Sequence, residues 1–91
     1  MEILHEKNRV FINDESWQML AELIYKKDDD GIHNISRTFV DPSLRGQGVA
    51  EKLMIAALDV IRKEGGKVRA TCSYAVKWLE KHDEYLDLLT K

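Results

Sequence analysis

The residues with the clearest chemical potential form the stretch DPSLRGQGVAEKL, residues 41–53, in which two glycines precede a long amphipathic segment. A Walker-type phosphate loop is excluded, because Val49 and Ala50 stand where its Lys-Ser or Lys-Thr pair is required. A dinucleotide fingerprint is also excluded, since Glu51 occupies the place of its third glycine or alanine. Two interpretations remain open. One is a tight strand-to-helix turn that needs glycine for a positive φ, and the other is a helix N-terminus whose free N–H groups bind an anion.

Two further residues, Cys72 and Tyr74, could take part in chemistry later in the chain. Cys72 is the only cysteine, which excludes an internal disulfide and suits a reducing cytoplasm. Free cysteine is often a small buried apolar filler, and residue type alone favours that interpretation. Tyr74 can likewise be a core aromatic at the start of a helix.

The elements that must position these residues follow from the hydrophobic pattern. Strands are predicted over residues 3–5, 9–12, 17–25, 32–40 and 67–72, and helical segments over 47–64, 74–81 and about 85–89. In the third strand, one apolar face is predicted to carry Trp17, Met19, Ala21, Leu23 and Tyr25. Pro42 should end the fourth strand, and Gly65-Gly66 should end the long helix.

The resulting order is ββββ-α-β-α in a single domain over residues 1–91. The long helix forms a crossover between the fourth and fifth strands, so these two strands should be parallel neighbours. The remaining sheet should be antiparallel. The fold class predicted from the sequence is therefore α+β with a mixed, mainly antiparallel sheet.

Charge and hydropathy exclude several classes of partner. The formal net charge is −2, no basic run is longer than Lys26-Lys27, and three aspartates follow that pair at once, so nucleic acid is not expected as a partner. The N-terminus lacks the apolar core of a signal peptide, and no apolar run could cross a bilayer. A cytoplasmic location is predicted, with no membrane partner and no metal site.

Two stretches of the sequence resemble those of a known superfamily. Residues 45–50, RGQGVA, are similar to the Arg/Gln-x-x-Gly-x-Gly/Ala signature of the GNAT superfamily of acetyl-CoA-dependent N-acetyltransferases. The predicted element order also resembles the GNAT core. Residues 72–75, Trp78-Leu79 and residues 82–88 look like the ending of a short-form GNAT family of roughly this length. The resemblance runs from about Ile35 to Leu88.

The resemblance implies an enzyme that transfers an acetyl group from acetyl-CoA to an amine acceptor. Loop amides would hold the coenzyme A pyrophosphate, with Arg45 as a charge partner. The pantetheine arm would lie between the fourth and fifth strands, where a backbone N–H polarises the thioester carbonyl. The implied coenzyme-binding residues are Phe39, Val40, Arg45, Gly46, Gln47, Gly48, Val49 and Ala50.

Catalytic roles follow from the same resemblance. Cys72 would lie near the acetyl group, where it could accept that group transiently or protonate the departing thiolate. Tyr74 is the rival proton donor. A second hypothesis is a non-catalytic module on the same fold that binds coenzyme A or another protein.

The general base is not assigned. Relatives of the short form often carry histidine at the position of Arg37, and arginine cannot act as a base, although it could bind an acidic group of the acceptor or cofactor. Glu22 is interpreted as a solvated residue, with action through water as the alternative. His33 lies at the far end of its strand, and His82 is interpreted as a helix-end or surface residue.

Overall fold

A single five-stranded sheet organises the computed structural model, which describes residues 2–89. The strands lie in the sheet in chain order, β1-β2-β3-β4-β5. Their bounds are β1 Leu4–Glu6, β2 Arg9–Asn13, β3 Met19–Lys27, β4 His33–Val40 and β5 Val68–Ala70. The helices are α1 Val49–Lys63 and α2 Ser73–Glu80, with short 3-10 segments η1 Pro42–Leu44 and η2 Asp83–Leu88.

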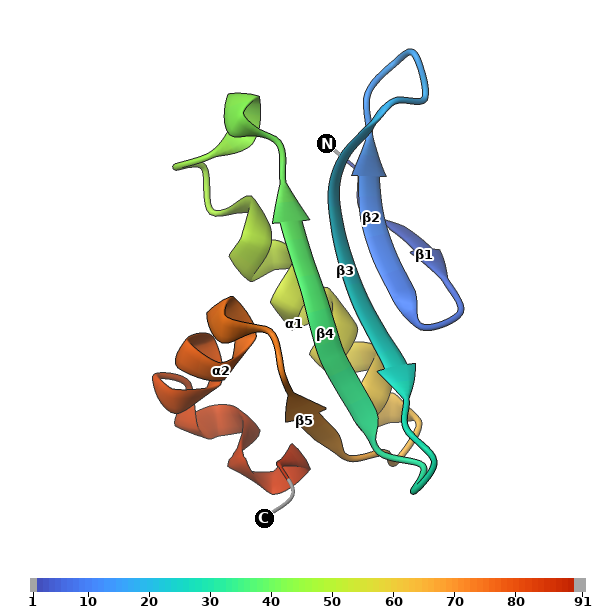
Figure 1. The fold of residues 1–91 in the computed structure, drawn as a ribbon, viewed down its shortest axis with the longest axis vertical. Coiled ribbons are helices and arrows are strands. Elements are labelled where there is room, and N and C mark those ends of the chain that lie inside the picture. Colours follow the sequence, from blue (N-terminus) through green and yellow to red (C-terminus); the bar gives the residue numbers. More distant parts are fainter. Residues whose placement is uncertain (1, 90–91) are drawn as a thin grey trace.

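The predicted topology is confirmed. The pairs β1–β2, β2–β3 and β3–β4 are antiparallel, and β4–β5 is parallel. Helix α1 provides the crossover between the two parallel strands. Figure 1 shows α1 crossing behind β4, with α2 and η2 beside β5, while the near face of β2–β4 carries no helix within residues 2–89.

The core lies between the sheet and α1. The helix has a periodic apolar stripe, and its inner residues Leu53, Ala57, Leu58 and Ile61 are fully buried. They pack in one cluster with inward-facing strand residues that include Val10, Leu23 and Ile35. Because α1 is fixed along its length in this way, the position of its N-terminus relative to β4 is fixed as well.

The parallel ladder between β4 and β5 is short, and this opens the sheet. Paired residues run only from His33↔Val68 to Ile35↔Ala70, and the Ile35 carbonyl accepts N–H bonds from both Thr71 and Cys72 at 3.1 Å. Strand β4 continues to Val40, where it still pairs with Ala21 of β3. Within residues 2–89, no strand pairs with the other edge of β4 after Ile35.

The third strand begins later than predicted, and the assignment of Trp17 to its buried face is wrong. The carboxylate of Asp14 accepts the backbone N–H groups of Ser16 and Gln18 at 2.7 and 3.0 Å, which closes a loop. Trp17 lies in that loop with φ 66° and is 80% exposed. The Asx turn therefore delays the start of β3 to Met19.

Two other predicted boundaries also shift inward. Gly48 adopts φ 71° as the N-cap, so α1 begins at Val49 and not at Gln47. The fifth strand is limited to Val68–Ala70, because the chain turns at Thr71 to enter α2. The first change leaves Gly46 to Gly48 outside the helix, and the second ends β5 at the level of Ile35.

The interpretation of Glu22 as a solvated residue is wrong. Its side chain is 11% exposed and lies between two arginines. Alternation along β3 places Glu22 on the face opposite the buried Ala21 and Leu23, and Figure 1 shows no helix over that face. Its carboxylate accepts a bond from Arg9 Nε and another from Arg37 Nε at 3.1 Å. Burial raises the pKa of Glu22, but the two guanidiniums outweigh that effect and hold the pKa below its ordinary value.

This ion-pair arrangement predicts a pH-dependent contribution to stability. Because the folded-state pKa is lowered, the stabilisation is complete above the pKa of an unfolded glutamate and is lost as the pH falls through the folded value. Glu22→Gln should lower the free energy of unfolding by roughly 1–3 kcal/mol at neutral pH. Urea titrations from about pH 7 to about pH 3 should show this difference shrinking with acid.

The exposed residue Glu80 on α2 supplies the control, and Glu80→Gln should change little at any pH. A difference between wild type and Glu22→Gln that does not depend on pH would contradict the assigned role of the carboxylate charge.

Candidate functional site

The glycine loop leads from β4 into α1 through a capped turn. Asp41 accepts bonds from the backbone N–H of Ser43 at 3.0 Å and from its hydroxyl at 2.6 Å, which starts η1 immediately after the strand. Gly46 and Gly48 then adopt φ 83° and 71°, a region that side chains disfavour. Nothing lies within 4 Å of a Cβ placed on either glycine. The loop therefore needs glycine for its backbone and also presents an open surface.

The first turn of α1 has free amide groups. Gly48 makes no side-chain cap bond, and within residues 2–89 no partner accepts the N–H groups of Gly46, Gly48, Val49 and Ala50. These N–H groups are the positive end of the helix dipole and can bind an anion. The two interpretations left open by the sequence are therefore compatible at this loop.

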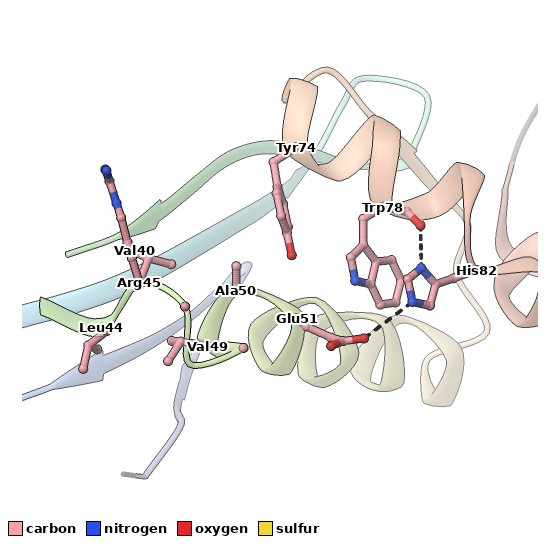
Figure 2. A pocket seen from close by; sticks show the side chains of 11 residues that line it. Val40, Leu44, Arg45, Val49, Ala50, Glu51, Tyr74, Trp78 and His82 are labelled. Atoms are coloured by element: carbon pink, nitrogen blue, oxygen red, sulfur yellow. Dashed lines mark hydrogen bonds and ion pairs between the residues drawn. The ribbon is translucent and has the colours of Figure 1, made fainter. Parts of the chain in front are cut away.

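A pocket of about 390 Å³ lies between this loop and α2. One wall is the loop with the first turn of α1, and the other is a row of aromatic side chains from α2 and the residues after it (Figure 2). The lining residues are Val40, Leu44, Arg45, Gly46, Gly48, Val49, Ala50, Glu51, Tyr74, Trp78 and His82.

Most of the residues predicted from the sequence meet in this pocket. Val40, Arg45, Gly46, Gly48, Val49, Ala50 and Tyr74 line it. Phe39, Gln47 and Cys72 are not among the lining residues. Phe39 pairs with Glu22 and faces the other side of the sheet, and the side chain of Gln47 turns back to donate to the Ser43 carbonyl at 3.3 Å.

Sequence reasoning missed the far wall of the pocket. His82 stacks on Trp78 with ring centroids 3.6 Å apart, and its Nδ1 donates to the Trp78 carbonyl at 2.6 Å. Its Nε2 lies 3.5 Å from the Glu51 carboxylate on α1 (Figure 2). His82 does follow the end of α2, as expected, but it lines the pocket and does not simply face solvent. The spacing of Trp78 and His82, four residues apart, was the available signal.

Cys72 lies at the N-cap of α2, next to the opening between β4 and β5. Its Sγ lies 3.6 Å from Thr38 Oγ1, and Thr38 points to the same face of the sheet as the buried Leu23 with which it pairs. Burial raises the pKa of the Cys72 thiol, but the N–H groups of Ala75 and Tyr74 and the Thr38 hydroxyl outweigh this, and the net pKa is lowered. Cys72 is therefore a half-buried thiol whose surroundings favour ionisation.

The pKa of Tyr74 shifts in the opposite direction from that of Cys72. Its ring extends from the start of α2 toward the first turn of α1 (Figure 2). Burial raises the pKa of Tyr74, and the negative charges of Glu51 and ionised Cys72 raise it further. The phenol stays protonated at neutral pH and can donate a proton into the pocket.

The remaining titratable candidates are not positioned to act as a base in this pocket. His33 is 2% exposed at the start of β4, and its Nδ1 donates to the Tyr25 carbonyl at 2.8 Å. Arg37 and Glu22 bond each other on the opposite face of the sheet. The site thus combines three features. They are an anion cradle, meaning the free N–H groups of Gly46, Gly48, Val49 and Ala50, the proton-donating phenol of Tyr74, and the Cys72 thiol at an opening in the sheet.

Comparisons with known proteins agree with this geometry. The chain matches the family described as GCN5-related N-acetyl-transferase over residues 9–88. Protein NATD1 of Mus musculus and of Homo sapiens are each 34% identical to it over 71 residues, or 76% of this chain. The chain spans 64% of the mouse protein and 63% of the human protein, slightly less than two thirds of each.

Solved structures show the same fold. The solution structure of a GCN5-like protein from Staphylococcus aureus is similar with a TM-score of 0.81 and 38% identity, over 98% of this chain and 87% of that one. Ard1 from Thermoplasma volcanium has a TM-score of 0.63 over 81% of this chain and 53% of its own, and its 22% identity supports the fold alone. The family match includes both the glycine loop and the segment around Cys72. The chain therefore belongs to the GCN5-related N-acetyltransferase family, as a short GNAT domain similar to NATD1.

Proposed function

We propose that this protein is an acetyl-CoA-dependent N-acetyltransferase that acts on an amine acceptor. The observation that carries the proposal is that the free amides at the start of α1 line the same pocket as the phenol of Tyr74 and the last residue of β4. The pocket extends beyond the amides to Val40 and Tyr74, which is further than a bare anion site needs. An elongated ligand such as coenzyme A, with a pyrophosphate within its chain, fits both parts.

The chain offers groups for each part of the coenzyme. The N–H groups of Gly46, Gly48, Val49 and Ala50 suit the pyrophosphate, with Arg45 as a charge partner. After Ile35 no strand pairs with this edge of β4 within residues 2–89, so the edge suits the amide-bearing pantetheine arm as far as Val40, whereas the N–H of Asp41 already donates to the Leu20 carbonyl. A backbone N–H on that edge can also donate to a thioester carbonyl oxygen.

Bound acetyl-CoA supplies an activated acetyl group as a thioester, and transfer to an amine releases a thiolate that needs a proton. Tyr74 is the group of this chain best suited to donate that proton, since its raised pKa keeps the phenol protonated. Cys72 is the other donor predicted from the sequence. Its lowered pKa makes it a weaker proton store but a better nucleophile, which supports the role of transient acetyl carrier over that of donor.

A base from the chain is not assigned. A lysine-like amine has a pKa near 10.4 and must lose a proton before it attacks. Glu22 is a poor acceptor for that proton, because its pKa is lowered and both carboxylate oxygens bond arginines. We propose that the acceptor amine loses its proton to solvent at the open face of the sheet.

The alternative function is a non-catalytic module that binds coenzyme A or a protein. One observation favours it: the position of Arg37 carries no base, and the neighbouring carboxylate of Glu22 is held in ion pairs. The two functions share the coenzyme site and differ in turnover.

The single-domain organisation over residues 1–91 and the cytoplasmic location stay predictions from the sequence, and the amine acceptor itself is a proposal.

Coenzyme binding can be tested at Gly48 with a matched control at Gly65. Both glycines have φ 71° and open space at their Cβ, but Gly48 faces the pocket and Gly65 follows the C-terminal end of α1. Gly48→Val should therefore weaken acetyl-CoA binding by about tenfold or more, because the side chain would fill the anion cradle. Gly65→Val should carry similar backbone strain without that loss.

Calorimetric titration with acetyl-CoA measures the affinity, and thermal denaturation shows that each variant folds. Gly48→Ala is the milder replacement if valine prevents folding. Equal affinities for the Gly48 and Gly65 variants would place the coenzyme elsewhere. No binding of acetyl-CoA by the wild type at millimolar concentration would contradict the proposed function.

The proton donor can be identified by comparing Tyr74→Phe with Cys72→Ala. If Tyr74 protonates the leaving thiolate, Tyr74→Phe should lower kcat by roughly a hundredfold with little change in acetyl-CoA affinity. Steady-state kinetics over a panel of amines, with calorimetry alongside, gives both quantities. A kcat that falls only in Cys72→Ala would transfer the donor role to Cys72.

The reactivity of Cys72 is a separate prediction. Because the pKa of its thiol is lowered, it should be alkylated by iodoacetamide at a lower pH than an ordinary cysteine. Thr38→Val removes one stabilising hydroxyl and should shift the pH profile upward. Mass spectrometry measures the extent of alkylation at each pH. After incubation of the protein with acetyl-CoA, it should also detect an acetyl adduct that is absent in Cys72→Ala. An unshifted profile in both proteins would refute the thiolate assignment.

A further inference from the structure

Arg37 has a guanidinium group that is held at one end and free at the other. Its Nε donates to Glu22 Oε1 at 3.1 Å, and within residues 2–89 no group accepts from Nη1 or Nη2. The side chain is 54% exposed. The terminal nitrogens therefore present free N–H donors that match a carboxylate or phosphate in a bidentate geometry.

The two other arginines of the sheet, Arg9 and Arg69, do not share this arrangement. Arg9 uses Nε, Nη1 and Nη2 to bond Glu22, Glu6 and the Met19 sulfur. Arg69 on β5 directs Nη1 to Asp28 and Nη2 to Asp30. Arg37 thus differs from two neighbours in the sheet that are occupied by internal carboxylates.

The free end of Arg37 is also held in place before any ligand arrives. Glu22 fixes the Nε side, and the guanidinium carbon lies 5.6 Å from the centroid of the Phe39 ring. A long side chain loses rotamer entropy when it binds, and prior anchoring reduces that loss. Arg37 is therefore prepared to bind an anion.

Arg37 lies on the face of β4 opposite α1, away from the coenzyme pocket. It pairs with Ile24, whereas the next residue, Thr38, pairs with the buried Leu23 and points to the α1 face. Thr38 reaches Cys72 at 3.6 Å beside the opening in the sheet. An acceptor that approaches this opening from the face without a helix (Figure 1) would meet Arg37, which is the β4 residue next to Thr38.

The charge around Arg37 favours a singly charged anion. Two arginines, Arg9 and Arg37, are balanced by two carboxylates, Glu6 and Glu22, in one connected cluster. A phosphate dianion would meet repulsion from the nearby Glu22 without a second free cation in the cluster. A carboxylate carries one negative charge, and its two oxygens can accept bonds from Nη1 and Nη2 of Arg37.

The shape of the face favours a polypeptide over a small molecule. Small-ligand sites are concave and enclose most of the ligand, whereas the face around Arg37 is an open sheet surface without a covering helix within residues 2–89. An extended chain can gain contact area along such a surface.

We propose that the acceptor is a polypeptide whose reacting amine has a carboxylate side chain beside it, and that Arg37 binds this carboxylate. The inference rests on the proposed acetyltransferase function and assigns its substrate class. Arg37 is a specificity residue in this scheme and takes no part in proton transfer.

The test measures peptide binding to the protein saturated with coenzyme A, so that it does not depend on turnover. The probes are two fluorescent short peptides that differ only in carrying Glu or Gln beside a lysine. Anisotropy should show about tenfold tighter binding of the Glu peptide to the wild type, with the difference falling at high salt. Arg37→Ala should abolish the difference, and Arg69→Ala should keep it.

Arg37→Gln serves as a second variant, because its amide can still donate to Glu22 if Arg37→Ala destabilises the fold. Equal affinities of the Glu and Gln peptides, or a Glu preference that survives both Arg37 variants, would overturn the inference. Tighter binding of a phosphoserine peptide would overturn the carboxylate assignment, and inhibition by free glutamate without peptide binding would overturn the polypeptide assignment. Failure of coenzyme A itself to bind would instead reject the proposed function, and this inference with it.

Discussion

The backbone carbonyl of Ile35 marks the point where the parallel ladder between β4 and β5 ends, because it accepts the N–H groups of both Thr71 and Cys72. Beyond it, β4 stays in the sheet through its pairing with β3, while the chain after β5 turns away into α2. A parallel pair that continued would satisfy the β4 edge with main-chain bonds and leave no opening. The pocket, the position of Cys72 and the access from the opposite face all follow from this early separation.

The periodicity of the sequence was sufficient for the sheet and for α1, because both depend on apolar residues that recur at fixed spacing. It failed at Trp17, where the Asp14 carboxylate captures backbone N–H groups that the strand would have used. It also failed at Glu22, since alternation assigns a face but does not say which charged residues from neighbouring strands meet there.

The sequence likewise predicted some residues of the candidate site and missed others. Gly46, Gly48 and Arg45 could be found from the chain alone, because a local backbone conformation and a helix start are encoded in neighbouring residues. His82 required the packing of α2 beside α1, which brings it to Glu51 across 31 positions of sequence. Contacts between elements of this kind depend on tertiary structure, and a single sequence gives no direct measure of them.

Under the proposed function, Glu22 connects stability with acceptor recognition on the open face of the sheet. Its carboxylate is held ionised by two guanidiniums, so it cannot readily take a proton from an acceptor amine. The same bond from Arg37 fixes the Nε side of that arginine and leaves its other nitrogens free. If Glu22 accepted a proton as a base, it would lose its ion pair with Arg37 and release that side chain. If Arg37 is to stay anchored, the Glu22 carboxylate must remain ionised and bonded to it. The structure combines the second arrangement with an open face, and this agrees with the proposals that charge selects the acceptor and that solvent deprotonates it.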